Sequence, residues 1–290
     1  MTEVTNIFLN DGNQMPQLGF GVFQIPDHNE AKKAVEEALS NGYRLIDTAE
    51  AYNNQKAVGE AIKDSSVKRE DIFLTTKLWV SNYTFEKATK AIDEDLKELG
   101  TDYIDLMLLH QPYGDVYGAW DAMQAAQRAG KIKSIGVSNF APDQYMNLEL
   151  EHEVSPAINQ IEINPWFQQT NDVKYFQGRD IAVEAWAPFA EGKDNIFSNK
   201  TLKAIGEKYD KTVGQVILRW LIQRSIVVIP KSVHSERQKE NMDIFDFQLS
   251  QEDMKQIAGL DKGVSQFFDH RDPAVIDDIF GESLKQLRHS

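Results

Sequence analysis

The chain has 290 residues, of which 41% are hydrophobic and 26% are charged, as is usual for a globular protein. Its net charge of −14 and its pI of about 4.9 argue against a nucleic-acid partner or an anionic membrane surface. The sequence contains no cysteine, which excludes disulfides, thiolate metal sites and cysteine nucleophiles.

The N-terminal residues carry none of the features of a targeting signal. Residues 1–6 contain no basic segment, and no long apolar segment follows them. No run in the sequence approaches the roughly 18 apolar residues of a membrane span. We therefore expect a cytoplasmic protein that works without a membrane or a nucleic acid.

The first elements predicted along the chain are a hairpin, a strand and a helix. Two short apolar segments, residues 7–9 and 15–18, flank Asp11-Gly12, a pair that favours a tight hairpin turn. A short glycine-containing strand follows over residues 18–23, and the spacing of apolar residues predicts a helix over about 29–40.

The remainder of the chain repeats this alternation of apolar strands and amphipathic helices. Further strands are predicted at residues 43–46, 72–79, 103–110, 132–137, 157–163, 180–186 and 226–229. With the strand at 18–23 they make eight. Helices separate successive strands, including those over about 55–63, 84–99 and 116–129 and one that begins near 142, and a further helix begins near 235 after the last strand.

This alternation predicts one α/β domain over residues 1–290. Strands that are apolar throughout indicate a parallel sheet buried on both faces. Eight units in about 250 residues favour a closed (β/α)8 TIM barrel over an open sheet. An open dinucleotide-binding sheet would carry Gly-x-Gly-x-x-Gly after its first strand, and residues 18–24 lack the third glycine.

Polar residues follow the predicted strands at the end where barrel enzymes carry their catalytic groups. Asp47, Lys77 and His110 end three consecutive strands, and Tyr52 lies shortly after Asp47. Taken singly, each has an ordinary explanation as a helix cap, a lysine that reaches water or a structural histidine. Their coincidence favours a catalytic site. Further strand ends carry Ser138, Asn139, Gln160, Glu162, Trp186, Lys231 and Ser232.

The four residues suit proton donation to a carbonyl oxygen. A buried Asp47 needs a cation, which Lys77 supplies, and a nearby ammonium lowers the pKa of a phenol from about 10. We therefore expect Lys77 to lower the pKa of Tyr52, so that Tyr52 acts as a general acid while His110 orients the carbonyl. Neither a Ser/His/Asp nucleophile nor metal-ligand spacing is present, so we expect no metal. A bound hydride donor would complete the reaction.

The last predicted strand is followed by residues that suit a phosphate. Lys231, Ser232 and Arg237 lie around the start of the helix near residue 235, where barrel enzymes often bind phosphate. A solvated basic patch is the alternative explanation.

Six segments together resemble the aldo-keto reductase superfamily. They are residues 42–49 with Tyr52, 76–79, 108–110, 136–140, 159–162, and 229–232 with 237–241. They occur in the family's order over nearly the whole chain. The sequence is most similar to the bacterial branch that includes 2,5-diketogluconate reductases.

The resemblance implies a barrel closed at the bottom by the N-terminal β-hairpin, with residues 266–273 as a C-terminal loop over the active site. It also implies a catalytic tetrad of Asp47, Tyr52, Lys77 and His110, and NADPH or NADP+ bound without a Rossmann fold. The residues matched to the cofactor are Ser138, Asn139 and Gln160 at the carboxamide, Trp186 stacked on the nicotinamide, Lys231, Ser232 and Arg237 at the 2′-phosphate, and Glu240 and Asn241 near the adenine. Those matched to the substrate pocket are Phe23, Trp79, Gln111 and Phe268.

Three departures from the family pattern concern the pocket and its support. Gln55 replaces a glutamate that is common after the tyrosine, and we expect it to affect helix packing more than chemistry. Gln111 replaces a tryptophan found in many relatives, which makes the pocket wall more polar. No long insertion follows residues 164–166 or Phe189, so we expect an open and permissive pocket.

The sequence thus predicts a monomeric, NADPH-dependent reductase of small aldehydes, ketones and α-keto or diketo compounds, including 2,5-diketogluconate-like substrates. Two alternatives stay open. One is a binding or regulatory protein on the same barrel, against which the complete tetrad argues. The other is a preference for NADH, against which Lys231 and Arg237 argue because two cations suit a dianionic phosphate.

Overall fold

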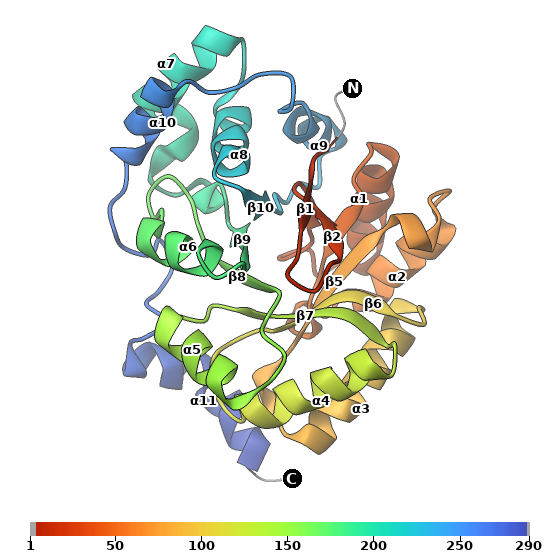
Figure 1. Cartoon of the computed structure of the whole chain (residues 1–290). Helices are drawn as coiled ribbons and strands as arrows, with labels where there is room; N and C mark the ends of the chain where they lie inside the picture. The colour runs from red at the N-terminus through yellow and green to blue at the C-terminus, as the bar shows by residue number, and fades with distance from the viewer. Residues whose placement is uncertain (1–3, 289–290) are drawn as a thin grey trace.

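A barrel of eight parallel strands forms the centre of the computed structural model, which describes residues 4–288 (Figure 1). The strands lie side by side in chain order and pair in parallel. They are β3 (Phe20–Gly21), β4 (Leu45–Asp47), β5 (Phe73–Leu78), β6 (Ile104–Leu109), β7 (Ile132–Ser138), β8 (Ile158–Glu162), β9 (Ala182–Trp186) and β10 (Ile226–Val228).

Backbone hydrogen bonds at the start of β3 close the barrel against β10. Leu18 bridges Val228 in parallel, the Gly19 N–H donates to the Val228 carbonyl at 2.8 Å, and the Val228 N–H donates to Gln17 at 3.0 Å. A side chain at Gly19 would collide with Leu45 on β4, so glycine allows the two strands to approach. The predicted (β/α)8 barrel is therefore confirmed.

An outer ring of helices covers the sheet. The helix α3 shows how the sequence sets these elements: Thr84 caps its N-terminus, Ala88, Ala91 and Ile92 are buried, and Gly100 ends it at a φ of 62°. The helices are α1 (His28–Ser40), α2 (Gln55–Asp64), α3 (Phe85–Leu99), α4 (Val116–Arg128), α5 (Pro142–Glu151), α6 (Thr170–Gln177), α7 (Lys200–Tyr209), α8 (Val213–Gln223), α9 (Ser235–Met242), α10 (Gln251–Ala258) and α11 (Pro273–Arg288). Short 3-10 turns add η1 (Glu50–Tyr52), η2 (Arg69–Asp71), η3 (Val80–Asn82) and η4 (Ala190–Ser198).

The predicted N-terminal hairpin closes the bottom of the barrel. Its strands, β1 (Asn6–Phe8) and β2 (Gln14–Pro16), pair antiparallel. Met15 is completely buried and belongs to the same apolar cluster as Leu45, Leu106 and Ile158 of the barrel strands. Because the strands start at this end, the hairpin leaves the opposite, C-terminal end of the barrel open for a site.

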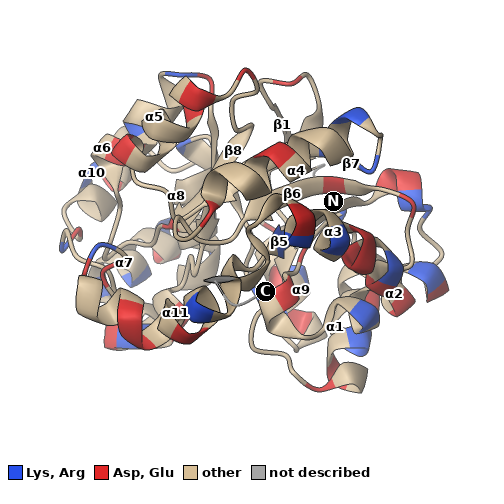
Figure 2. Ribbon diagram, turned by 90° about the horizontal axis from the view of Figure 1, so that it is seen from below, with Lys and Arg blue, Asp and Glu red and all other residues tan. Residues whose placement is uncertain are grey.

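Charged side chains lie on the outer helices, where α1, α2 and α3 carry both signs (Figure 2). Lys32 of α1 reaches Asp64 of α2 at 2.6 Å, for example. Within residues 4–288, no helix is both long enough and apolar enough to cross a bilayer.

The C-terminal segment holds an element that the sequence interpretation did not include. Beyond the predicted loop at 266–273, the chain forms the helix α11. Phe280 of this helix is 2% exposed and its ring packs against Trp79 at 5.8 Å and Tyr113 at 5.1 Å. The segment therefore supplies a packed wall at the C-terminal end of the barrel.

Candidate active site

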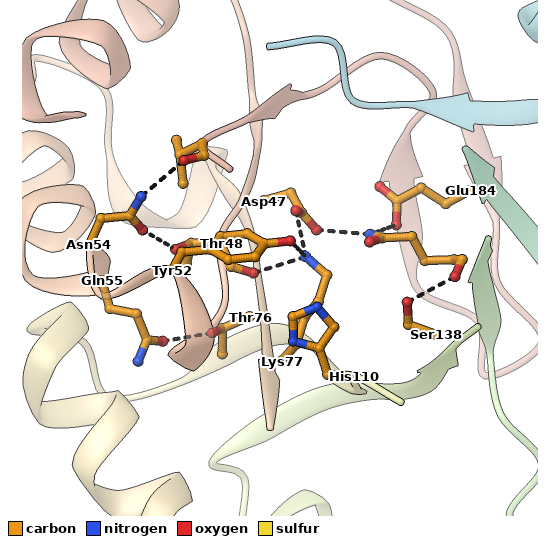
Figure 3. A network of polar contacts seen from close by, with 12 residues as sticks. Asp47, Thr48, Tyr52, Asn54, Gln55, Thr76, Lys77, His110, Ser138 and Glu184 are labelled. Atoms are coloured by element: carbon orange, nitrogen blue, oxygen red, sulfur yellow. Dashed lines mark hydrogen bonds and ion pairs between the residues drawn. The ribbon is translucent and has the colours of Figure 1, made fainter. Parts of the chain in front are cut away.

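Asp47 and Lys77 form a buried ion pair at the C-terminal ends of two neighbouring strands (Figure 3). The Lys77 Nζ lies 2.5 Å from Asp47 Oδ1 and donates to the Thr48 carbonyl at 3.0 Å. Lys77 is completely buried and Asp47 is 2% exposed. Because an unpaired buried charge is very costly, the burial of either charged side chain depends on the other as its counter-ion.

Tyr52 reaches the same ammonium from the turn that follows β4. It ends η1, and its hydroxyl lies 3.4 Å from the Lys77 Nζ (Figure 3). Glu50, on the same turn, accepts hydrogen bonds from the Trp79 N–H and from Asn82 Nδ2. Glu50 thus fastens the turn that carries Tyr52 to the chain just after Lys77.

The pKa of Tyr52 departs from the sequence prediction. Burial raises it above its ordinary value of 10, and this effect outweighs the lowering by the Lys77 charge. The expectation that Tyr52 has a lowered pKa is therefore wrong for this structure. Burial also acts against the charge on Lys77, but attraction to Asp47 and Tyr52 raises its pKa, so the ammonium stays protonated.

His110 completes the group as a neutral imidazole. Burial, followed by repulsion from Lys77, holds its pKa well below 6.5. Its ring lies edge-on to Tyr52 and Trp79, with centroids 5.7 and 5.1 Å away. A neutral imidazole carries one N–H, which can donate to a carbonyl oxygen beside Tyr52.

A second buried carboxylate lies across the barrel from Asp47. Gln160 Nε2 donates to Asp47 Oδ2 at 2.9 Å and to Glu184 Oε2 at 2.8 Å, so its amide spans the interior between β4 and the pair β8–β9. Burial, together with repulsion from Asp47, raises the pKa of Glu184 to about 8. Glu184 was missed in the sequence, although a glutamate inside the apolar run 181–186 is itself a signal.

Ser138, Asn139 and Trp186 lie beside this amide. The Ser138 hydroxyl donates to the Gln160 carbonyl at 2.9 Å, and Asn139 Nδ2 donates to the His110 carbonyl at 3.1 Å. The Trp186 indole N–H donates to Asn139 Oδ1 at 2.8 Å. The structure therefore brings these predicted residues together at one place above the ion pair.

Buried amides support the loops that carry the site. Asn54 accepts from the Thr48 hydroxyl at 2.8 Å and donates to the Val22 carbonyl at 2.9 Å, which fixes the loop that bears Phe23. Gln55 accepts from the Thr76 hydroxyl at 2.6 Å and donates to Asp95 at 2.6 Å. Gln55 thus links α2 to β5 and α3, in keeping with the packing role predicted for it.

A cavity of about 1600 Å³ runs from Tyr52 and His110 to Lys231 and Arg237. Lys77 lies beneath its wall and does not line it. All the other predicted site residues do: Phe23, Asp47, Tyr52, Trp79, His110, Gln111, Ser138, Asn139, Gln160, Trp186, Lys231, Ser232, Arg237, Glu240, Asn241 and Phe268. Phe267 and His270 of the predicted C-terminal loop also line it, as does Phe280 of α11, which the sequence interpretation did not include.

The two ends of the cavity differ in charge and polarity. At the far end, Lys231 and Arg237 are exposed and have no ion pair within residues 4–288. At the near end, Phe23, Trp79 and Phe280 form an aromatic wall, in which Phe23 packs against Tyr52 and Trp79 against His110 and Phe280. Glu162, a further strand-end residue, instead accepts from Ser265 Oγ at 2.6 Å and anchors the C-terminal segment.

Residues 17–262 match the aldo/keto reductase family. The chain is 44% identical over 255 residues to the glyoxal reductase of Bacillus subtilis (strain 168), an alignment that covers 88% of this chain and 92% of that protein. It is 43% identical over 266 residues to the methylglyoxal reductase DkgA of Escherichia coli (strain K12), covering 91% and 96%. Among solved structures, an aldo-keto reductase of Bombyx mori in complex with NADP superposes with a TM-score of 0.88 at 36% identity, covering 96% and 98%.

Proposed function

The chain belongs to the aldo/keto reductase family, and we propose that it reduces small aldehydes and ketones to alcohols with NADPH, with Tyr52 as the general acid. The observation that carries this proposal is the position of the Tyr52 hydroxyl. It lies 3.4 Å from the ammonium of Lys77, beside a neutral His110, at one end of a cavity whose other end carries two cations.

The donor groups along the cavity fit NADPH. Lys231 and Arg237 offer two cations that no carboxylate in residues 4–288 neutralises, in a protein of net charge −14. A dianionic phosphate suits such a pair. Both side-chain amide hydrogens of Gln160 are used by carboxylates, so its side-chain oxygen Oε1 is left to accept from a carboxamide.

We assign the cofactor contacts by these chemistries. Ser138, Asn139 and Gln160 would hold the carboxamide, and Trp186 would cover the nicotinamide ring. Lys231, Ser232 and Arg237 would hold the 2′-phosphate, with Glu240 and Asn241 at the adenine. The chemistry that bound NADPH supplies is donation of a hydride to the carbonyl carbon.

The residues of the chain then divide the proton transfer among themselves. His110 donates a hydrogen bond to the carbonyl oxygen and holds it beside the Tyr52 hydroxyl. Tyr52 gives its proton to that oxygen as negative charge develops there. Lys77 stabilises the phenolate that remains, and Asp47 keeps Lys77 in place.

Replacing Tyr52 with phenylalanine tests the assignment of the acid. We expect kcat to fall by roughly 10²–10⁴-fold, the usual contribution of a general acid, while NADPH affinity is kept. Tyr175→Phe is a matched control, because the Tyr175 ring packs against Tyr145 and Phe176 outside the cavity. A Tyr52→Phe enzyme with near-normal turnover would show that another group donates the proton.

We further propose α-keto and diketo compounds as the favoured substrates, with 2,5-diketogluconate-like molecules among them. Two relatives are named as reductases of glyoxal and methylglyoxal, which are both α-dicarbonyls. A panel of carbonyl compounds with NADPH, ordered by kcat/KM, tests this assignment. Simple monocarbonyls at the head of the order would contradict it.

We also propose that residues 1–290 work as one cytoplasmic, monomeric domain. Closure between Leu18 and Val228 joins the two edges of the central sheet, so these edges are not available for pairing with a second copy. Light scattering of the purified protein tests the monomer, since a mass near twice 33.0 kDa would contradict it.

A further inference from the structure

The substrate end of the cavity combines an aromatic wall with two polar side chains that have no assigned role. Phe23, Trp79 and Phe280 supply the apolar wall. A carbonyl or hydroxyl oxygen placed against such a wall loses its hydrogen bonds to water unless the protein replaces them. Gln111 and His270 line the cavity and belong neither to the tetrad nor to the residues assigned to the cofactor. The side chains of Gln24 and Lys193 also line it, but they donate to Glu191 Oε1 and to the Gln266 carbonyl.

Gln111 has a fixed backbone and a free side chain. The Tyr83 hydroxyl donates to the Gln111 carbonyl and accepts from its N–H, both at 3.0 Å. The side chain is 6% exposed, and its Oε1 is buried without a hydrogen-bond partner among residues 4–288. A buried amide oxygen without a partner is uncommon in a folded protein, and here the side chain lines the cavity.

His270 lines the same cavity from the C-terminal segment. Its ring lies 4.3 Å from that of Phe268 and 6.2 Å from that of Trp186, and its charge would affect the pKa of His110. The Tyr113 hydroxyl donates to the His270 carbonyl, which ties this segment to the loop that carries Gln111. Burial lowers the pKa of His270 to about 4, so near neutral pH its ring has one donor and one acceptor.

We propose that Gln111 and His270 form a second polar subsite, which binds a neutral oxygen on the carbon next to the reacting carbonyl. The inference rests on the proposed function and deepens it by naming the residues that favour α-dicarbonyls and α-hydroxycarbonyls. The Gln111 amide can donate through Nε2 to a carbonyl or hydroxyl oxygen and can accept a hydroxyl proton at the unpartnered Oε1, and a neutral imidazole offers one donor and one acceptor. Neither carries the positive charge that would select a carboxylate at this position.

Kinetics with methylglyoxal and propanal test the subsite, because propanal lacks only the second oxygen. In Gln111→Leu and in His270→Phe, we expect kcat/KM for methylglyoxal to fall by about tenfold, mainly through KM, with propanal changed less than about twofold. Ile279→Ala is the control, since Ile279 is an apolar residue of the cavity lining and its loss should affect both substrates alike. An unchanged ratio, or equal losses for the two substrates, would overturn the subsite.

Binding gives a readout that does not depend on turnover. Hydroxyacetone and butanone differ by a hydroxyl in place of a methyl group, and each can be titrated by quenching of Trp79 and Trp186 fluorescence without reduced cofactor. We expect the wild-type protein to bind hydroxyacetone more tightly and both variants to lose this preference. Equal affinities in the wild-type protein would overturn the subsite. Failure of the wild-type enzyme to reduce propanal or methylglyoxal would instead count against the proposed function.

Discussion

Replacing Lys77 with methionine would measure how strongly the buried ion pair is coupled to the fold. Methionine keeps the length of the side chain and removes its charge. Asp47, which is 2% exposed, would then keep Gln160 Nε2 at 2.9 Å as its remaining side-chain donor. Loss of one partner of a buried pair costs about 3–5 kcal/mol, which is a large part of the roughly 5–15 kcal/mol that holds a typical protein folded.

A double-mutant cycle separates the pair from its surroundings. Asp47→Asn keeps an acceptor for Gln160 but leaves the Lys77 ammonium with the Thr48 carbonyl at 3.0 Å and without its counter-ion. In Asp47→Asn/Lys77→Met, no buried charge remains at this position. We therefore expect the double variant to lose less stability than the two single variants together, with a coupling of about 0.5–3 kcal/mol.

The free energy of unfolding can be measured in urea at neutral pH by the fluorescence of the five tryptophans. The wild type, both single variants and the double variant are compared under identical conditions. Effects that add within about 0.5 kcal/mol would refute the idea that Asp47 and Lys77 stabilise the fold as a unit.

Three further predictions concern charge and protonation. Burial raises the pKa of Glu184 from 4.5 to about 8, so between these pH values the folded protein keeps a proton that the unfolded chain releases. The free energy of unfolding should therefore fall as pH rises from 4.5 to about 8, and urea unfolding of Glu184→Gln should show a smaller fall over the same range. The Lys231→Ala and Arg237→Ala substitutions should weaken NADPH binding by roughly 10–100-fold in a fluorescence titration but leave the affinity for NADH nearly unchanged. Equal losses of affinity for the two cofactors would refute the phosphate contact. Because burial raises the pKa of Tyr52 above 10, kcat for reduction should stay flat between about pH 7 and pH 9, and a decline there would contradict Tyr52 as the acid.

The barrel and the position of the ion pair follow from patterns that are local in the sequence. Several of the apolar strands end in a polar residue, and parallel strands place those ends on one rim. The meeting of Asp47, Lys77 and His110 could therefore be predicted from the sequence. The N-terminal hairpin likewise follows from Asp11-Gly12 between two apolar segments.

What the sequence interpretation missed depends on contacts between distant segments. Glu184 meets Asp47 through Gln160 only because β8 and β9 lie across the barrel from β4. The position of His270 is set by the packing of the C-terminal segment. The helix α11 was also missed, but its sequence does indicate a helix, because Ile276, Phe280 and Leu284 recur every four residues after Pro273.

The corrected pKa of Tyr52 changes the role that the chemistry assigns to Lys77. A proton donor must keep its proton until negative charge develops on the carbonyl oxygen, and burial ensures this by raising the pKa of Tyr52. A strongly lowered pKa would instead leave part of the enzyme as phenolate, which cannot donate. The ammonium of Lys77, 3.4 Å from the hydroxyl and itself kept protonated by Asp47, favours the phenolate only once the proton has moved. In the proposed mechanism, Lys77 therefore acts mainly on the product of proton transfer, whereas the burial of Tyr52 sets its resting state.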